Sequence, residues 1–265
     1  MLLCYYSNPM ARVYAIGNQK GGVGKTTTCL CLGEALTLYG KRVLCIDLDP
    51  QAALTVVLGL NPDTNHATIY EVIMGAANIE EIILKTKNDN FDLIPSRLDL
   101  AGAEAELLRM DEWQTSLQKA IEEIRPKYDY ILLDCPPSLG VLTIIALIAA
   151  DRVIVPVQAE FLAMVGLKQL NILINEVRKR YNPKLETRIL RTMYDRRTLH
   201  NREVAEELER LFGEKVYKTV INRTIKFADA SYSRESILSF APSSEAAKAY
   251  RQLAEEVIED EEKGS

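Results

Sequence analysis

The chain has 265 residues and a mass of 29.8 kDa, which suits one large domain or two small ones. Its 48% hydrophobic and 26% charged side chains are ordinary globular values and exclude wholesale disorder and a collagen-like repeat. The net charge of −5, taken for the whole chain, gives no support to nucleic-acid binding. However, residues 255–265 hold six of the 37 acidic side chains and one of the 32 basic ones, so the rest of the chain is neutral.

The cysteines and the apolar runs indicate in which cellular compartment the protein lies. The five cysteines are scattered, with neither a CxxC pair nor zinc-finger spacing, which favours buried thiols in a reducing cytosol. No apolar run approaches the roughly 20 residues that a membrane span needs. Residues 1–11 lack the charged start and the long apolar core of a signal peptide. We therefore expect a cytoplasmic protein without a membrane partner, in which residues 1–11 extend ahead of the fold.

Short apolar runs alternate with longer helical patterns along the chain. Several runs are continuously apolar, as is typical of parallel strands covered on both faces. The alternation predicts an α/β fold, a single doubly wound domain with a mostly parallel sheet over 12–254, followed by an acidic C-terminal tail over 255–265. The predicted strands are 12–18, 43–48, 91–95, 130–135, 153–157, 187–192 and 216–221. The predicted helices are 26–39 (with Gly40 as its stop), 100–108, 113–124, 139–149, 164–181, 201–212 and 244–258.

A glycine-rich segment, NQKGGVGKTT, follows the first predicted strand and opens the first predicted helix. Glycines let backbone N–H groups converge on phosphate oxygens, and a helix N-terminus adds donors and a partial positive charge. Lys25 can reach the β- and γ-phosphates of a nucleotide, and the Thr26 hydroxyl can hold Mg²⁺. A chance glycine-rich turn is the alternative, but the strand and helix on either side favour a phosphate loop. The predicted phosphate-binding residues are Gly21, Gly22, Val23, Gly24, Lys25, Thr26 and Thr27.

Two predicted strands end in aspartates. Asp47 and Asp49 end the second strand, and Asp134 ends the fourth. Ligands of open α/β sheets bind at the carboxyl ends of the strands, where a carboxylate can orient water or serve a metal. Asp134 follows an apolar strand in the Walker B form and can bind Mg²⁺ through water. From the residues alone, Asp47 and Asp49 could equally form a turn that caps the next helix, and Asp134 could cap a turn.

These motifs together resemble the ParA/MinD superfamily of P-loop ATPases, and in particular its ParA/Soj branch. Gln19 stands where the general pattern GxxxxGK[ST] has glycine, and the loop instead carries a second lysine, Lys20. This is the deviant Walker A form of the family. The segments DLDPQ (47–51), DCPPSLG (134–140) and PVQAE (156–160) follow in the family's order. The resemblance covers about residues 12–255 and implies a P-loop NTPase fold.

The resemblance also implies an ATPase that uses ATP and Mg²⁺. By match, Lys20 reaches across a nucleotide-sandwich homodimer to the partner's phosphates, as an arginine finger does, and Lys25 acts beside it. Asp49 positions the attacking water, while Asp47 and Asp134 join Thr26 at the metal. The ATP-bound dimer would bind DNA non-specifically on the nucleoid. A ParB-type centromere-binding protein would stimulate hydrolysis and so release the DNA, in chromosome or plasmid partition.

Two local departures from the family leave the base-contacting residues open. After Gln51 the chain reads Ala52-Ala53-Leu54-Thr55, where Soj-like sequences more often read Gly-Asn-Ala-Thr. Asn222 stands where the family usually has the proline of an Ile-Pro-Arg run. Neither change touches the phosphate chemistry.

The C-terminal third has a local positive excess. Residues 188–234 contain eleven Lys and Arg against seven Asp and Glu. Loop cations can contact DNA phosphates without reading base sequence, although a solvated surface also explains the composition. The resemblance favours DNA contact, first through Arg197 and Arg223 and then through Lys226 and Arg234.

Three other functions compete with DNA segregation. A MinD-type membrane-associated division-site ATPase would need a basic amphipathic helix at the C-terminus, whereas 257–262 are acidic. An iron–sulfur carrier ATPase would need paired cysteines, and Cys135 has no suitably placed second cysteine. A nucleotide-gated scaffold without ATPase activity would not require the intact Lys20, Lys25 and Asp49.

Overall fold

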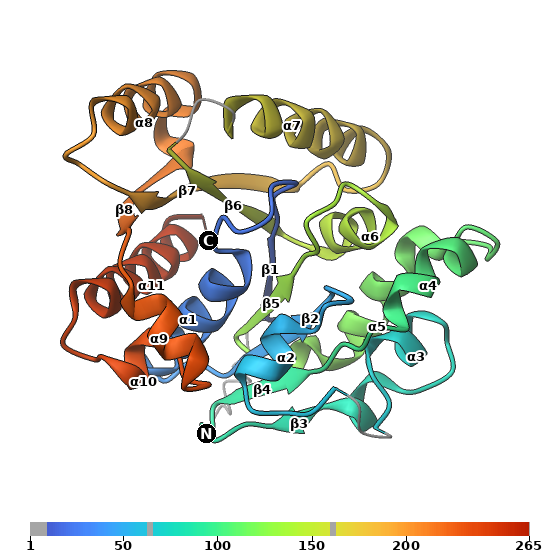
Figure 1. The fold of residues 1–265 in the computed structure, drawn as a ribbon. Helices are drawn as coiled ribbons and strands as arrows, with labels where there is room; N and C mark the ends of the chain where they lie inside the picture. Colours follow the sequence, from blue (N-terminus) through green and yellow to red (C-terminus); the bar gives the residue numbers. More distant parts are fainter. Residues whose placement is uncertain (1–9, 63–65, 160–162, 265) are drawn as a thin grey trace, which may run out of the picture.

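The structure is a computed structural model that describes residues 10–62, 66–159 and 163–264. Within these residues an eight-stranded sheet runs in the order β3-β4-β2-β5-β1-β6-β7-β8 through the centre of the molecule (Figure 1). All neighbouring strands are parallel except the β3–β4 pair. Because β1 is central, the chain builds one half of the sheet, returns through β5 and then builds the other half. The predicted doubly wound α/β fold is confirmed.

The strands are β1 (Arg12–Ile16), β2 (Val43–Asp47), β3 (Leu84–Lys85), β4 (Phe91–Ile94), β5 (Tyr130–Asp134), β6 (Arg152–Gln158), β7 (Glu186–Tyr194) and β8 (Val216–Asn222). The helices are α1 (Lys25–Thr37), α2 (Ala53–Val57), α3 (Ile69–Ile73), α4 (Leu100–Leu107), α5 (Ser116–Ile124), α6 (Val141–Ala149), α7 (Ala163–Arg180), α8 (Leu199–Phe212), α9 (Lys226–Tyr232), α10 (Ile237–Phe240) and α11 (Glu245–Gly264).

All seven predicted strands are present, and their ends differ from the prediction by two residues at most. The elements that were not predicted are β3 and the helices α2, α3, α9 and α10, which are too short for a clear apolar period. The predicted helix over 113–124 is divided, because Trp113–Thr115 form a 3₁₀ turn ahead of α5. Gly40, with φ of 72°, lies just beyond the end of α1 as predicted.

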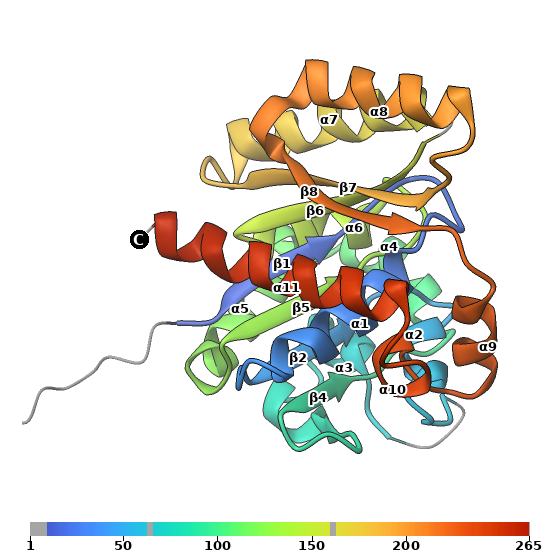
Figure 2. The same ribbon diagram turned by 90° about the vertical axis from the view of Figure 1, so that its left-hand side faces the viewer.

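The strands are apolar on both faces because helices cover both sides of the sheet. On β1, Val13 and Ala15 face the core under α3–α8, whereas Tyr14 and Ile16 face the core under α1, α10 and α11. Figure 2 shows α11 lying along the second face beside α1. Both cores therefore hold the carboxyl ends of the central strands in fixed relative positions.

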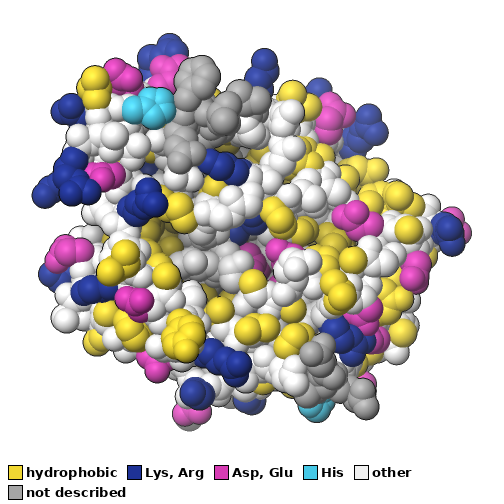
Figure 3. Space-filling view, viewed as in Figure 1, with side chains coloured by type: hydrophobic (Ala, Val, Ile, Leu, Met, Phe, Trp, Pro, Cys, Tyr) yellow, Lys and Arg dark blue, Asp and Glu magenta, His cyan; other side chains and the backbone are white. Residues whose placement is uncertain are grey.

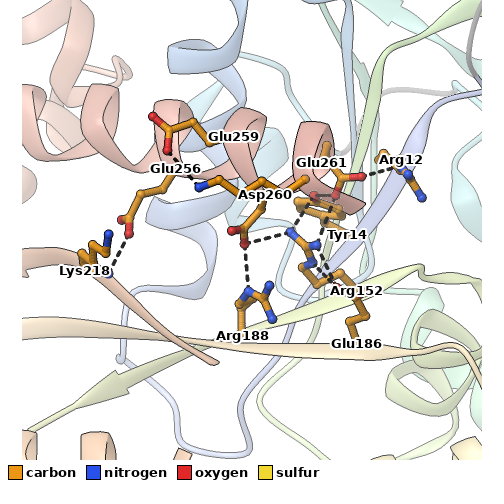
Figure 4. Close-up of polar contacts among 11 residues, drawn as sticks. Arg12, Tyr14, Arg152, Glu186, Arg188, Lys218, Glu256, Glu259, Asp260 and Glu261 are labelled. Carbon is orange, nitrogen blue, oxygen red and sulfur yellow. Dashed lines mark hydrogen bonds and ion pairs between the residues drawn. The ribbon is translucent and has the colours of Figure 1, made fainter. Parts of the chain in front are cut away.

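The last helix is longer than predicted. It continues six residues past Ile258 to Gly264, so the acidic residues of 255–264 form helical turns of α11. Figure 4 shows these turns beside three arginines, Arg12, Arg152 and Arg188, which lie near the amino-terminal ends of β1, β6 and β7. Arg152 lies 2.8 Å from Glu186 and 3.4 Å from Asp260, and Tyr14 donates a hydrogen bond to Glu261. Further contacts include Arg188–Asp260 (2.8 Å), Arg12–Glu261 (2.5 Å) and the backbone N–H of Lys218 to Glu256 (2.7 Å). Asp260 and Glu261 of this segment are thus paired with arginines of the sheet.

None of the helices in the described parts of the chain is long and apolar enough to cross a membrane.

Candidate phosphate-binding site

The glycine-rich loop joins β1 to α1 at the carboxyl edge of the sheet. Gly22 and Gly24 have φ of 70° and 90°, which side chains with a Cβ rarely adopt. Gly24 caps α1 without a side-chain hydrogen bond, and the first turn of α1 contains no acidic residue. The first N–H groups of this helix are therefore available to an anion.

Lys25 lies inside the loop, not on the surface. Its side chain is 7% exposed, and its Nζ donates to the backbone carbonyl of Lys20 at 3.1 Å. Burial lowers the pKa of Lys25, while the negative charges of Asp134 and Asp49 oppose that shift. A phosphate in the loop would supply further negative charge and stabilise the ammonium.

Asp134 is the residue that best fits a metal ion. It is fully buried, and neither carboxylate oxygen has a hydrogen-bond partner among the described residues. Burial and the nearby charge of Asp47 raise the pKa of Asp134 well above its usual range. The Thr26 hydroxyl lies close enough to oppose this in part, although it makes no hydrogen bond of normal length and angle to Asp134. A buried carboxylate without a partner is costly, and a hard divalent cation relieves that cost. Thr26 and Asp134 therefore fit Mg²⁺.

Asp47 is occupied by protein hydrogen bonds. Its Oδ1 accepts from the N–H of Asp49 at 3.1 Å, and its Oδ2 accepts from the N–H and hydroxyl of Thr55 at 2.9 and 2.8 Å. Burial raises the pKa of Asp47 to about 6, although these bonds oppose the shift. This carboxylate fixes the start of α2.

The described residues contain no group of three or more His, Cys, Asp or Glu side chains with metal-ligand geometry. A magnesium ion at Thr26 and Asp134 would therefore take its other ligands from phosphate oxygens and water, as this ion commonly does.

Asp49 lies half-buried on the same edge, where its charge acts on both Lys25 and Asp134. Its Oδ1 accepts from the N–H of Gln51 at 2.9 Å, which leaves the other oxygen available to a water molecule. The predicted positions of Lys25, Thr26, Asp49 and Asp134 therefore converge.

Lys20 lies at the start of the loop, beside the end of β6. Its Nζ is 3.4 Å from Oε1 of Gln158, and its N–H donates to Oδ1 of Asn18 at 3.0 Å. Gln158 belongs to the PVQAE segment that is part of the family resemblance, whereas Glu160 of that segment lies outside the described residues. Asn18 was not identified from the sequence, because a polar residue ahead of a glycine-rich loop gives no distinct signal.

A cavity of about 280 Å³ adjoins the loop and has room for a nucleobase. It lies between the loop, the ends of β7 and β8, and α9. Thr192, which lines it, donates to the carbonyl of Val23 at 2.9 Å and ties β7 to the loop. The other lining residues include Thr27, Met193, Asn222, Arg223 and Phe227. Sequence reasoning left the base contacts open, and only the departure at Asn222 pointed to this region.

Ala52 has a left-handed backbone. Its φ is 52°, and it caps the N-terminus of α2 with its side chain buried. This is the position where Soj-like sequences more often have glycine. The departure therefore places a strained alanine where a residue without Cβ would fit without penalty.

The four predicted DNA-contacting residues are exposed, but they differ in their partners. Arg197, in the loop after β7, forms an ion pair with Asp195 at 2.7 Å. Arg223, Lys226 and Arg234, around α9, form no ion pair with any described residue. Figure 3 shows Lys and Arg side chains over α8 and beside β8 on the face that carries the loop. The exposed apolar residues Ile225 (80%) and Tyr232 (92%) also belong to the α9 region.

The positive excess of 188–234 is smaller in the structure than in the composition. Only the pair of Arg188 with Asp260 lowers it, because Asp260 lies outside the segment. The pairs Arg191–Glu209, Arg210–Glu207 and Arg197–Asp195 lie within the segment and leave its net charge unchanged. The cations of 188–234 without an ion pair to a described residue are Arg196, Arg202, Lys215, Lys218, Arg223, Lys226 and Arg234, and the last three lie around α9.

The AAA domain family model matches residues 11–187. The chain is 43% identical over 249 residues to the sporulation initiation inhibitor protein Soj of Bacillus subtilis. This match covers 94% of the present chain and 98% of Soj. It is 44% identical over 258 residues to the chromosome partitioning protein ParA of Caulobacter vibrioides, with 96% of each chain covered. A crystal structure of a Mycobacterium smegmatis protein named cobyrinic acid a,c-diamide synthase, with bound ADP and magnesium, matches with a TM-score of 0.85 at 38% identity over 97% of both chains. The chain belongs to the AAA domain family and, within it, to the ParA/Soj-type partitioning ATPases of the ParA/MinD superfamily.

Proposed function

We propose that this chain is an ATP-dependent DNA segregation ATPase that hydrolyses ATP to ADP and phosphate with Mg²⁺. The observation that carries the proposal is the convergence of four charged side chains, Lys20, Lys25, Asp49 and Asp134, on the loop at the carboxyl edge of the sheet. Relatives named Soj and ParA support the segregation role.

ATP is bound with its phosphates against residues 21–27 and its base in the 280 Å³ cavity. The N–H groups of the loop and of the first turn of α1 donate to the phosphate oxygens. Thr26 and Asp134 hold Mg²⁺, and Asp47 acts through its hydrogen bonds to Asp49 and Thr55. The bound ion neutralises the charge of the β- and γ-phosphates.

Hydrolysis uses the residues around the γ-phosphate. Asp49 accepts a hydrogen bond from the attacking water and orients it, while Lys25 stabilises the charge that develops on the phosphate oxygens. Lys20 supplies a second cation, across the interface of an ATP-bound homodimer. Without a partner protein, turnover of about 10⁻⁴ to 10⁻² per second is expected of such a site.

The ATP-bound dimer binds DNA through its phosphates, without reading the base sequence. Arg223 lines the nucleotide cavity and Lys226 precedes Phe227, which also lines it, so nucleotide binding can order the DNA-contacting surface directly. Arg197 and Arg234 extend that surface. A ParB-type centromere-binding protein stimulates hydrolysis, which dissolves the dimer and releases the nucleoid DNA.

A DNA mobility-shift assay tests this function. Duplexes of unrelated sequence are titrated with the protein in the presence of no nucleotide, ADP, ATP or a slowly hydrolysed ATP analogue. We expect sequence-independent binding with ATP and the analogue only. Equal binding in all four conditions, or in none, would contradict the proposal.

A membrane-associated role of the MinD type remains a separate outcome of experiment. The C-terminal turns of α11 are acidic and paired with Arg152 and Arg188, which favours DNA as the partner. ATP-dependent sedimentation with vesicles of anionic lipid would support the membrane role instead.

A further inference from the structure

Asn18 joins the phosphate loop to the end of β6 through both ends of one carboxamide. Its Nδ2 donates to the carbonyl oxygen of Pro156 at 2.7 Å, and its Oδ1 accepts from the N–H of Lys20 at 3.0 Å. The residue is buried, with 6% of its surface exposed. Among side chains of this length, only asparagine offers a donor and an acceptor on one rigid planar group.

The second of these bonds shapes the backbone ahead of Lys20. A carboxamide oxygen that accepts from the N–H two residues later closes an Asx turn, which fixes the direction in which the chain leaves residue 18. The bond to Pro156 prevents the carboxamide from rotating away. The backbone of Lys20 is therefore fixed relative to β6 as well as within its own loop.

The side chain of Lys20 is held by the same strand. Its Nζ contacts Oε1 of Gln158, two residues beyond Pro156 on β6. Lys25 adds a third constraint, because its Nζ donates to the carbonyl oxygen of Lys20. Lys20 is thus held by a short network, in which Asn18 fixes its backbone N–H.

We propose that Asn18 is a positioning residue for Lys20, which sets the second loop lysine for its role in ATP hydrolysis. The inference rests on the proposed ATPase function and deepens it. Asn18 is placed to act on hydrolysis through Lys20, whereas the N–H groups that bind phosphate belong to residues 21–27. Its effect should therefore fall on kcat and not on nucleotide affinity.

The test is a double-mutant cycle with Asn18→Ala and Lys20→Ala, measured with Mg·ATP. We expect Asn18→Ala to lower kcat by about 10-fold to 100-fold, since small misplacements of catalytic groups have effects of that size. The Kd for ATP, from a fluorescent analogue, should stay within about threefold of wild type. In the Lys20→Ala background, Asn18→Ala should change kcat by less than about twofold, because the two residues act as one unit.

A second variant and a matched control separate positioning from general loss of structure. Asn18→Asp keeps the acceptor for the Lys20 N–H but faces the Pro156 carbonyl with a carboxylate, so it should behave like Asn18→Ala. Asn201 makes an equivalent bridge, donating to the carbonyl of Ala159 at 3.0 Å and accepting from the N–H of Asp195 at 2.8 Å. Asn201→Ala should therefore leave kcat unchanged.

The outcomes distinguish this inference from the proposed function. No ATP hydrolysis by the wild-type chain, or full hydrolysis by Lys20→Ala, would remove the proposed catalytic scheme and this inference with it. If the wild type hydrolyses ATP and Lys20→Ala does so at a reduced but measurable rate, the inference alone fails under any of four results. The first is a wild-type kcat in Asn18→Ala or Asn18→Asp, and the second is a loss of kcat in Asn201→Ala equal to that in Asn18→Ala. The third is a loss of ATP affinity in Asn18→Ala that parallels its loss of kcat. The fourth is a loss of kcat in the Asn18→Ala/Lys20→Ala variant that equals the sum of the two single effects.

Discussion

Asp47 and Asp134 are register partners at the ends of the adjacent strands β2 and β5, yet their carboxylates are held in opposite ways. Asp47 accepts three hydrogen bonds, whereas neither oxygen of Asp134 has a hydrogen-bond partner among the described residues. The first carboxylate builds the start of α2, and the second is left for a cation. Two neighbouring acids at one sheet edge thus have different tasks, which their hydrogen bonds reveal.

The two acids should make the nucleotide-free protein less stable at high pH. Burial raises the pKa of Asp47 to about 6, and it raises the pKa of Asp134 well above its usual range. The folded state then binds more protons than the unfolded state, so the unfolding free energy falls as the pH rises from about 4 through these raised values. Asp134→Asn removes one of these groups, and we expect it to be more stable than wild type at pH 8 but not at pH 4. Urea unfolding at several pH values, without Mg²⁺, measures this, and a pH-independent difference would contradict it.

Asp49→Asn should separate ATP binding from hydrolysis. The amide still accepts from the N–H of Gln51, so the turn after β2 is kept, but it is a poor acceptor for a proton from water. We expect kcat to fall by about 100-fold or more while the Kd for Mg·ATP changes little. Single-turnover hydrolysis and analogue binding give the two quantities. A loss of affinity in step with the rate would show a structural role instead.

Ala52→Gly should stabilise the protein. The left-handed backbone at Ala52 costs an L-residue about 1–2 kcal/mol, and part of that gain is offset by the greater freedom of glycine in the unfolded chain. We expect a net gain of about 0.5–1 kcal/mol in the free energy of unfolding. Ala53→Gly, one residue further on and inside α2, is the matched control and should lose about 1 kcal/mol. Destabilisation by both changes would mean that the buried methyl of Ala52 matters more than its backbone.

DNA affinity should depend more on Arg223 than on Arg197. Arg223 forms no ion pair with a described residue, whereas Arg197 must exchange Asp195 for a phosphate. We expect Arg223→Ala to weaken ATP-dependent DNA binding and to reduce the salt slope by about 1. Arg210→Ala, which removes an exposed arginine paired with Glu207 on α8, is the control and should change neither. Equal effects of Arg223→Ala, Arg197→Ala and Arg210→Ala would place the DNA elsewhere.

The acidic end of α11 should contribute to stability through Arg152. The Arg152 side chain is 6% exposed and depends on Glu186, Asp260 and Glu261 for its neutralisation. Replacing Asp260 and Glu261 together with their amides leaves a buried cation with one carboxylate, and we expect a loss of about 2 kcal/mol. Glu259→Gln removes only the exposed contact with Lys263 and should cost less than about 0.5 kcal/mol. Equal, small effects would show that α11 is held by its apolar face alone.

The strands and the phosphate loop were predictable because their signals are local. Continuous apolar runs such as Tyr130–Asp134 mark strands that are covered on both faces, and glycines such as Gly22 and Gly24 mark a backbone that other residues avoid. The short helices around the site, α2 and α9, carry no such signal. α2 follows the end of β2, and α9 follows the end of β8. The sequence pattern does not show that these two strand ends lie at the same site.

By itself the sequence determined the doubly wound fold, the two loop lysines and the aspartates at the strand ends, since each depends on residue types within one short segment. Only the tertiary structure decided how the charges are shared. The pairing of Arg188 with Asp260, 72 positions away, turns part of a predicted basic surface and of a predicted acidic tail into one neutral contact. The bridge from Asn18 to Pro156 spans 138 positions. Ion pairs and hydrogen bonds act over a few ångströms, so they are set by which strands lie side by side, and composition along the chain cannot reveal them.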